Sequence, residues 1–260
     1  MKIGILDSGI GGFITSKKLI ENSTHSFVVL MDFKNLPYGT GKTKEELLNI
    51  LKINLNTLFY EYFCDKVILV CNTISSVYLE FKNEIDELYG PEKIIDIVTL
   101  TKNYIGTNKV NLIATSYTVN SGIYDDISNK KIAKDEWVQL AENYVANKES
   151  LFNFEIPNAI FDMSNNIILL GCTHFSLFED IFKMSGLNVI FQSEIIKNIN
   201  LETTEKPTHL DKKSLIIVYT TNGENHSHKI LQLLHTLNLD KISSLLKFNI
   251  NKNINKLNNI

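Results

Sequence analysis

A pattern that occurs twice in the amino-acid sequence constrains the fold more than any other feature. Residues 67–73 (VILVCNT) and residues 168–174 (ILLGCTH) are both short apolar runs that end in a cysteine followed by polar residues. Each run leads into a stretch with helical periodicity, so each predicts a buried strand followed by a helix. Such strands are typical of parallel sheets covered by helices, and we therefore predict an α/β fold.

The same alternation of strand and helix extends over most of the chain. We predict strands at residues 3–6, 26–32, 67–70, 94–98, 110–114, 167–170, 189–191 and 215–220. We predict helices at residues 13–21, 43–63, 75–89, 120–127, 134–149, 174–184 and 225–237. The glycine-rich residues 9–12 lack the spacing of a phosphate-binding loop, so we interpret them as a tight strand-to-helix turn. Residues 249–260, rich in Asn, Lys and Ile, form a predicted tail.

The pattern restarts near residue 100, which divides the chain into two similar halves. A polar strand end at Asp7 precedes Cys71 in the first half, as Thr115 precedes Cys172 in the second. We therefore predict two similar α/β domains with mainly parallel sheets, related by a pseudo-twofold axis. The predicted boundaries are residues 1–97 plus 206–260 for the first domain and residues 98–205 for the second. Because ligands bind at the carboxyl edge of such sheets, we expect the active site in the interdomain cleft.

The composition excludes several classes of protein. The net charge is −3, so we expect no nucleic-acid partner. No apolar run is long enough to cross a membrane, and a signal peptide is not evident, so we expect no membrane partner and a cytoplasmic location. Arginine is absent. A carboxylate on a ligand must therefore be held by N–H groups, hydroxyls, amides or lysine.

The three cysteines, Cys64, Cys71 and Cys172, match neither a disulfide framework nor the paired ligands of a metal site. We interpret Cys64 as a buried apolar residue. Each of the other two stands where a strand ends and a helix begins, and the positive end of a helix lowers the pKa of a thiol. A thiolate and a thiol on opposite faces of one substrate suit inversion at carbon, because one removes a proton and the other returns one.

The residues around these cysteines also carry a family resemblance. The matching segments, in chain order, are residues 4–12 (GILDSGIGG), 37–39 (PYG), 70–73 (VCNT), 113–118 (IATSYT) and 170–174 (LGCTH). Over nearly its whole length the chain resembles glutamate racemases of the aspartate/glutamate racemase superfamily. The resemblance implies an isomerase that needs no cofactor and interconverts L- and D-glutamate, the latter for peptidoglycan and hence cell-wall biogenesis and cell shape.

The resemblance also implies roles for particular residues. Cys71 and Cys172 would be the two catalytic proton-transfer groups, assisted by Asp7 and His174 respectively. The implied contacts with glutamate come from Asp7, Ser8, Pro37, Tyr38, Gly39, Asn72, Thr73, Thr115, Thr118, Thr173 and His174. No metal is implied. A homodimer is compatible with the sequence, which does not define the oligomeric state.

Two departures from the family pattern leave alternatives open. Family members often carry a Cys-Pro-rich segment ending in a glutamate, whereas residues 140–149 (LAENYVANKE) lack both residue types, and Glu149 is one candidate for that glutamate. Ser116 stands where the family usually has proline. The alternatives are an aspartate or hydantoin racemase, a Cys-His acyl-transfer enzyme that uses Cys172 and leaves Cys71 without a role, and a non-catalytic partner-binding protein with the racemase fold.

Overall fold

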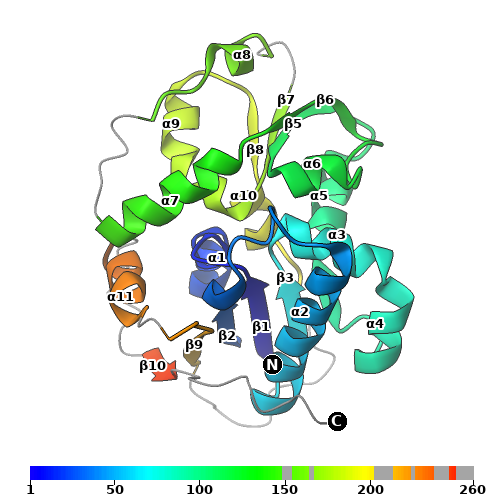
Figure 1. Cartoon of the computed structure of the whole chain (residues 1–260), viewed down its shortest axis with the longest axis vertical. Helices are drawn as coiled ribbons and strands as arrows, with labels where there is room; N and C mark the ends of the chain where they lie inside the picture. Colours follow the sequence, from blue (N-terminus) through cyan, green and yellow to red (C-terminus); the bar gives the residue numbers. More distant parts are fainter. Residues whose placement is uncertain (148–153, 164–166, 202–212, 224–225, 237–245, 250–260) are drawn as a thin grey trace.

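Two parallel β-sheets form the framework of the protein (Figure 1). The computed structural model describes residues 1–147, 154–163, 167–201, 213–223, 226–236 and 246–249. Every strand pair in these residues is parallel, which confirms the predicted α/β fold. The predicted tail lies outside the described residues, except for Asn249.

The first sheet is centred on the N-terminal strand. Its strand order is β10-β9-β2-β1-β3-β4. The bounds are Leu246–Asn249 for β10, Leu215–Tyr219 for β9, Ser26–Met31 for β2, Lys2–Asp7 for β1, Lys66–Leu69 for β3 and Ile94–Asp96 for β4. β1 is buried from its second residue, Ile3, onward. A strand with helices on both faces is apolar in its interior, as residues 3–6 of β1 are.

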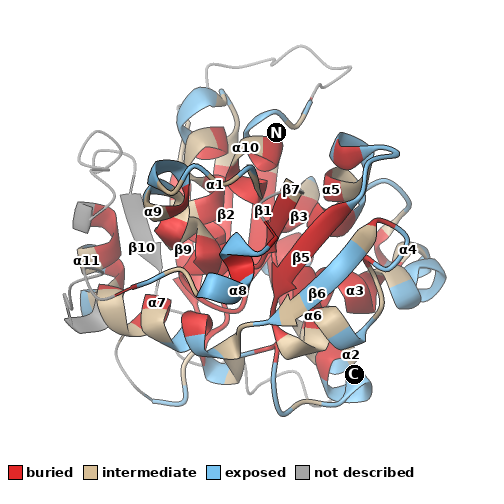
Figure 2. Cartoon of the chain, turned by 90° about the horizontal axis from the view of Figure 1, so that it is seen from above, coloured by how far each residue is buried: buried red, intermediate tan, exposed pale blue. Residues whose placement is uncertain are grey.

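The second sheet has the order β6-β5-β7-β8. Its strands are β6 (Ser128–Ala133), β5 (Val110–Ala114), β7 (Ile167–Gly171) and β8 (Val189–Phe191). β5 and β7 are the central strands and are almost fully buried, whereas most of β6 is exposed at the sheet edge (Figure 2). Charged residues on an edge strand discourage pairing with other chains.

Helices follow most of the strands. Those associated with the first sheet are α1 (Gly11–Asn22), α2 (Lys44–Asn56), α3 (Asn72–Glu80), α4 (Lys82–Tyr89), α5 (Ile97–Ile105) and α11 (Ser227–Thr236). The remaining helices are α6 (Ser116–Asn120), α7 (Asp135–Asn147), α8 (Asn158–Phe161), the 3-10 helix η4 (Thr173–Phe178), α9 (Glu179–Met184) and α10 (Gln192–Lys197). Short helical turns occupy Phe33–Asn35 and Thr57–Glu61. No helix in the described part of the chain is long and apolar enough to cross a membrane.

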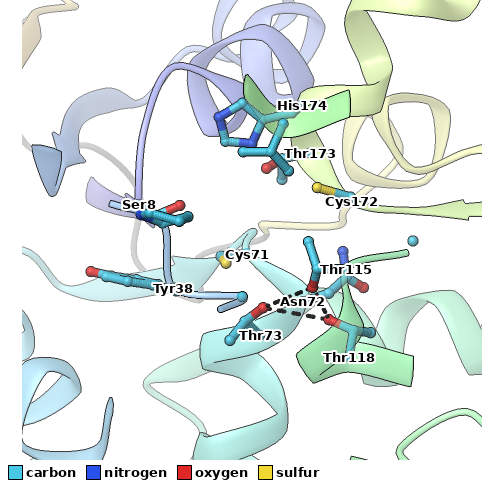
Figure 3. A pocket seen from close by; sticks show the side chains of 14 residues that line it. Ser8, Tyr38, Cys71, Asn72, Thr73, Thr115, Thr118, Cys172, Thr173 and His174 are labelled. Atoms are coloured by element: carbon cyan, nitrogen blue, oxygen red, sulfur yellow. Dashed lines mark hydrogen bonds between the residues drawn. The ribbon is translucent and has the colours of Figure 1, made fainter. Parts of the chain in front are cut away.

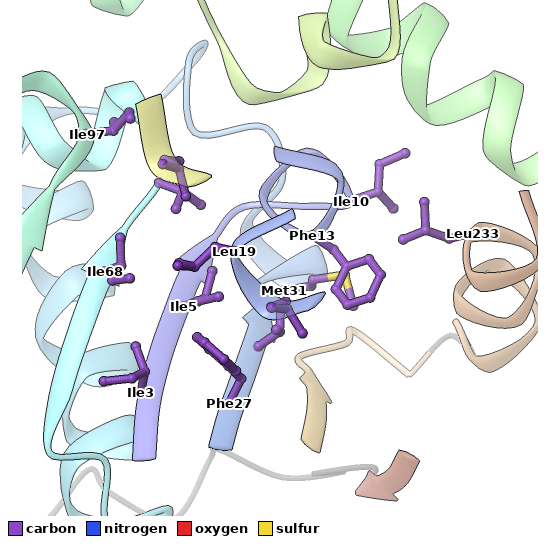
Figure 4. Close-up of a cluster of buried hydrophobic side chains, with 14 of the residues drawn as sticks. Ile3, Ile5, Ile10, Phe13, Leu19, Phe27, Met31, Ile68, Ile97 and Leu233 are labelled. Carbon is purple, nitrogen blue, oxygen red and sulfur yellow. The ribbon is translucent and has the colours of Figure 1, made fainter. Parts of the chain in front are cut away.

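Helix α1 joins the two halves. Its buried side chains belong to a core cluster that also includes residues of β1, β5 and α11 (Figure 4). On its other side, the Thr15 hydroxyl donates to the Thr173 carbonyl oxygen (3.2 Å) and lies 3.1 Å from the Ser176 hydroxyl. The continuous core explains how the ends of both sheets are held facing one another.

Most predicted elements are present, but several predictions differ from the structure. The predicted strand 94–98 ends at Asp96, because α5 begins at Ile97. The predicted helix 75–89 is two helices, α3 and α4, which meet at Phe81. The predicted helix 120–127 is wrong, because α6 ends at Asn120 and the following residues form turns. The edge strand β6 was not predicted, since its sequence SNKKIA lacks the apolar run of a buried strand.

Candidate active site

A small cavity lies where the carboxyl ends of both sheets meet. Cys71 and Cys172 directly precede α3 and η4, and Thr115 directly precedes α6. The cavity has a volume of about 20 Å³. Its lining residues are Ser8, Pro37, Tyr38, Gly39, Cys71, Asn72, Thr73, Thr115, Thr118, Val138, Gly171, Cys172, Thr173 and His174. The structure thus brings together every predicted site residue except Asp7, which lies behind the lining. Of the lining residues, the sequence analysis did not single out Val138 and Gly171.

Both catalytic candidates reach the cavity from buried positions. Cys71 is 7% exposed and Cys172 is 8% exposed, and Figure 3 shows their sulfur atoms on different sides of the pocket. Burial raises the pKa of the Cys71 thiol well above its ordinary value, and the Asp7 carboxylate raises it further. The N–H groups of Ile74 and Thr73 at the start of α3 act in the opposite direction but are outweighed. The helix end therefore acts on this thiol in the predicted direction, but the net pKa is raised because burial and Asp7 outweigh it.

Asp7 is fully buried at the end of β1. Its Oδ2 accepts hydrogen bonds from the N–H groups of Gly12 (2.7 Å) and Gly9 (3.3 Å), and its Oδ1 accepts one from the Thr173 hydroxyl (3.3 Å). Burial raises the pKa of Asp7, although His174 and the two N–H groups partly oppose this. A Cβ atom at Gly12 would lie 2.3 Å from the Asp7 Cβ, so glycine is needed for this close approach. The glycine-rich segment is the predicted strand-to-helix turn.

His174 occupies a buried, ionic environment beside Cys172. Its Nε2 lies 2.7 Å from Oε1 of Glu142 on α7. Burial alone would lower the pKa of His174, but hydrogen bonds with Cys172 and Glu142 outweigh burial and raise it. The raised pKa favours the imidazolium form of the ring, which places a positive charge beside Cys172.

Glu142 is the functional residue that the sequence analysis missed. Its Oε1 also accepts a hydrogen bond from the Ile10 N–H (3.2 Å), and its Oε2 forms an ion pair with Lys229. Burial raises the pKa of Glu142, but His174 and Lys229 together lower it below its ordinary value. Glu149, the candidate named from the sequence, lies outside the described residues.

A signal for Glu142 was present in the sequence. The buried face of α7 carries Trp137, Val138, Ala141 and Val145, and Glu142 stands on this face. A carboxylate on the apolar face of a helix is costly unless it is paired, so its presence there indicates a specific partner.

Hydroxyl groups form one wall of the cavity. The Thr73 hydroxyl lies 3.4 Å from both the Thr115 and Thr118 hydroxyls, which are 3.2 Å apart (Figure 3). Gly39 packs closely against this cluster, because a Cβ atom there would lie 2.7 Å from the Thr115 Cβ. The Tyr38 hydroxyl donates to the buried Asp32 (2.7 Å), which anchors the loop that carries Gly39.

Asn72 belongs to a buried polar network. Its Nδ2 donates to Gln192 Oε1 (2.7 Å), and its Oδ1 accepts from Gln192 Nε2 (3.0 Å) and the Tyr124 hydroxyl (2.7 Å). Gln192 Nε2 also donates to the Thr101 hydroxyl (3.0 Å). Gln192 follows β8 in the second half, so the network fixes a cavity residue of one half against the other.

The arrangement suits proton transfer to and from a small polyanionic molecule. Hydroxyls, amides and N–H groups line the cavity, as the absence of arginine requires. Within the described part of the chain, no cluster of three His, Cys, Asp or Glu side chains could hold a metal ion. Cys71 lines the same cavity as Cys172 and His174, which argues against the acyl-transfer alternative.

Comparisons with known proteins agree with this geometry. No protein-family model matches the chain. The chain is 30% identical over 250 residues to a glutamate racemase of Fusobacterium nucleatum, covering 88% of this chain and 91% of that protein. It is 29% identical over 277 residues to a glutamate racemase of Buchnera aphidicola, covering 96% and 98%.

Solved structures show the same fold. A glutamate racemase from Bacillus anthracis matches with a TM-score of 0.74 and 17% identity, covering 95% of this chain and 96% of that one. A glutamate racemase from Francisella tularensis in complex with D-glutamate matches with a TM-score of 0.69 and 20% identity, covering 97% of each chain.

Proposed function

The chain belongs to the glutamate racemase family, and from that premise we propose that Cys71 and Cys172 racemise glutamate by moving protons at opposite faces of its α-carbon. The observation that carries the proposal is the placement of both sulfur atoms on one cavity, each at a strand end in a different half. Two thiols on one cavity supply the acid and the base that inversion requires.

The protons balance over one turnover. In one direction the Cys172 thiolate removes the α-proton, and the Cys71 thiol donates its proton to the opposite face of the carbanion. The enzyme is then left with a Cys172 thiol and a Cys71 thiolate, which is the starting state for the reverse direction. The imidazolium of His174 lies beside Cys172, and Asp7, whose pKa is raised by burial, is suited to exchange a proton near Cys71.

The other lining residues would bind glutamate through neutral groups. The hydroxyls of Thr73, Thr115 and Thr118 form a cluster suited to a carboxylate. Further contacts would come from Ser8, Asn72, Thr173, His174 and the loop Pro37, Tyr38 and Gly39. Fixed donors of this kind stabilise negative charge as it develops at the α-carbon and its carboxylate.

The proposal also covers the cellular role of the product and the domain boundaries of the chain. The D-glutamate formed would supply peptidoglycan synthesis. The domain boundaries near residues 97 and 206 remain part of the proposal, and the two sheets support them, because one is built from residues 2–96 and 215–249 and the other from residues 110–191. A homodimer stays a prediction.

The test is incubation of the purified protein in D₂O with each enantiomer of glutamate and of aspartate, without added cofactor. Circular dichroism follows inversion, and NMR follows deuterium at the α-carbon. We expect inversion of both glutamate enantiomers, and activity on aspartate alone would favour the aspartate alternative. No exchange with any of the four refutes the proposal.

Two variants test the mechanism itself. Cys71→Ser and Cys172→Ser should each reduce racemisation by several orders of magnitude, because serine is a far weaker acid than cysteine. Cys64→Ser is the matched control, since Cys64 lies in the core and not on the cavity. Near wild-type turnover in either active-site variant refutes the two-thiol mechanism.

A further inference from the structure

Lys229 reaches the active site from outside the cavity that holds the cysteines. It lies on α11, which follows β9 of the first sheet, whereas its ion-pair partner Glu142 lies on α7, between β6 and β7 of the second. Figure 1 shows α11 beside the C-terminal end of α7. The Lys229 side chain is 18% exposed and that of Glu142 is 5% exposed, so the pair is largely withdrawn from water.

Lys229 has a second contact besides the ion pair with Glu142. Its Nζ lies 5.2 Å from the centre of the Phe33 ring, within the range of a cation–π contact. It also borders a second cavity of about 300 Å³, which shares Pro37, Gly39 and Thr115 with the active-site cavity. The ammonium group therefore has a defined location at the edge of the site.

Both carboxylate oxygen atoms of Glu142 have partners, and the partners come from both halves of the protein. Oε1 receives the His174 ring and the Ile10 N–H, while Oε2 receives Lys229. Ile10 and Lys229 both belong to the first half of the protein, and His174 belongs to the second. The carboxylate is thus oriented by groups from the opposite half.

We propose that Lys229 is a positioning residue for the reaction: its ammonium group orients the Glu142 carboxylate, which in turn orients the His174 ring beside Cys172. This inference rests on the proposed function. Because α11 and α7 belong to different halves, the complete chain of contacts exists only when the halves are packed together.

The charges that face one another here define the effect of removing Lys229. Glu142 faces His174 from η4 and Lys229 from α11, and its charge also acts on Asp7 at the end of β1. His174 in turn contacts Cys172. With Lys229 present, two carboxylates are balanced by two cations. Without it, the cluster carries excess negative charge, which retains the proton on His174.

The experiment compares Lys229→Met and Lys229→Arg with wild type by measuring kcat and KM for both glutamate enantiomers across a pH series. In Lys229→Met we expect kcat to fall roughly tenfold, with little change in KM. A tenfold loss is smaller than the full contribution of an acid–base group, because the group is still present but less well oriented. The pH profile of kcat/KM should move to higher pH. Lys229→Arg restores the charge, so most of the wild-type kcat and the wild-type pH profile should return.

Matched controls separate positioning from a general loss of stability. Lys44→Met removes the lysine of an exposed ion pair with Glu80 and should leave kcat and the pH profile unchanged. In a second comparison, Lys229→Met is added to the Glu142→Gln variant. There it should reduce kcat much less than it does in the wild type. An unshifted pH profile in Lys229→Met overturns the inference, as does an equal loss of kcat in both backgrounds.

A measurement without turnover distinguishes this inference from the proposed function. NMR of the protein with isotopically labelled histidine follows the titration of His174, which should move to higher pH in Lys229→Met because a neighbouring positive charge is gone. Absence of racemisation by the wild type refutes the proposed function, whereas an unchanged His174 titration refutes the role of Lys229.

Discussion

Replacing Glu142 with glutamine perturbs the buried charge cluster with little change in shape. The carboxylate receives hydrogen bonds from His174 (2.7 Å) and the Ile10 N–H (3.2 Å) and pairs with Lys229. The amide oxygen of glutamine can take the place of Oε1 and still accept from both Ile10 and His174. The contributions removed are therefore the negative charge that strengthens the His174 contact and the ion pair with Lys229.

The expected loss of stability follows from these two contacts. A hydrogen bond to a charged group contributes about 1.5–3 kcal/mol, and a partly exposed ion pair about 0–1 kcal/mol. A neutral hydrogen bond still contributes about 0.5–1.5 kcal/mol, so losing the charge on the His174 contact costs about 1–1.5 kcal/mol. Together with the ion pair, we therefore expect Glu142→Gln to lower the free energy of unfolding by about 1–2.5 kcal/mol. The full cost of stranding a buried charge does not arise, because Lys229 is 18% exposed and His174 can release its proton.

The loss depends on pH in a defined direction. The pKa of His174 is raised in the folded protein, so its contribution is complete below the unfolded pKa and is lost as the pH rises through the raised value. The pKa of Glu142 is lowered, so its contribution is present above the unfolded pKa and is lost as the pH falls through the lowered value. The difference between wild type and variant is therefore largest between about pH 4.5 and 6.5 and shrinks in alkaline solution.

Urea denaturation at a series of pH values measures this difference. The chain contains one tryptophan, Trp137, which is buried on α7 near Glu142 and reports unfolding by its fluorescence. Glu80→Gln, which breaks the exposed pair with Lys44, is the control and should cost less than about 1 kcal/mol. Equal stability of Glu142→Gln and wild type near pH 6, or a difference that does not vary with pH, refutes the reasoning.

Three further substitutions test packing and polar contacts elsewhere. Gly11→Ala should destabilise the fold and reduce activity, because its Cβ would lie 2.5 Å from the Thr173 hydroxyl; unchanged urea denaturation and kcat would contradict this. Gln192→Met removes the partner of Asn72 and should raise KM for glutamate roughly fivefold. Steady-state kinetics measure this, and an unchanged KM would contradict the prediction. Asn111, fully buried in β5, has no hydrogen-bond partner for its amide among the described residues, so Asn111→Leu should stabilise the protein by about 1–2 kcal/mol; a lower urea midpoint would count against it.

The sequence was sufficient for those parts of the fold that rest on apolar burial. The buried strands β1, β5 and β7 were predicted because they are short, mainly apolar runs. The edge strand β6 was not predicted, because its lysines face solvent and its pairing depends on β5 rather than on its own hydrophobicity. The break between α3 and α4 at Phe81 was not predicted either. Both helices keep an apolar face, so the helical periodicity of apolar residues continues across the break.

The site was predictable where strand ends supply its residues. Cys71, Thr115 and Cys172 follow strands of parallel sheets, so sheet topology alone brings them to one edge. Glu142 and Lys229 lie within helices far from that edge in sequence. Their contact with each other depends on how α7 and α11 pack, which residue spacing does not encode.

The raised pKa of Cys71 shows that a helix end alone does not make this thiol a base. The N–H groups of α3 are present, yet burial and the Asp7 carboxylate outweigh them. Cys172 has the opposite neighbour, an imidazolium held by Glu142. The two halves are thus alike in backbone and opposite in the charge beside each sulfur, with a carboxylate near Cys71 and an imidazolium beside Cys172.

This asymmetry predicts the order in which the thiols react with a thiolate-selective reagent. In the resting enzyme near neutral pH, iodoacetamide should alkylate Cys172 before Cys71, because the thiolate is the reacting species, burial and Asp7 raise the pKa of Cys71, and the two residues have nearly equal exposure, 8% and 7%. Peptide mass spectrometry over a time course measures both rates in one sample, and buried Cys64 serves as an internal reference for loss of structure. In Glu142→Gln the rate at Cys172 should fall while that at Cys71 changes little. Faster labelling of Cys71 in the wild type would show that the imidazolium does not set the resting charge of the pair.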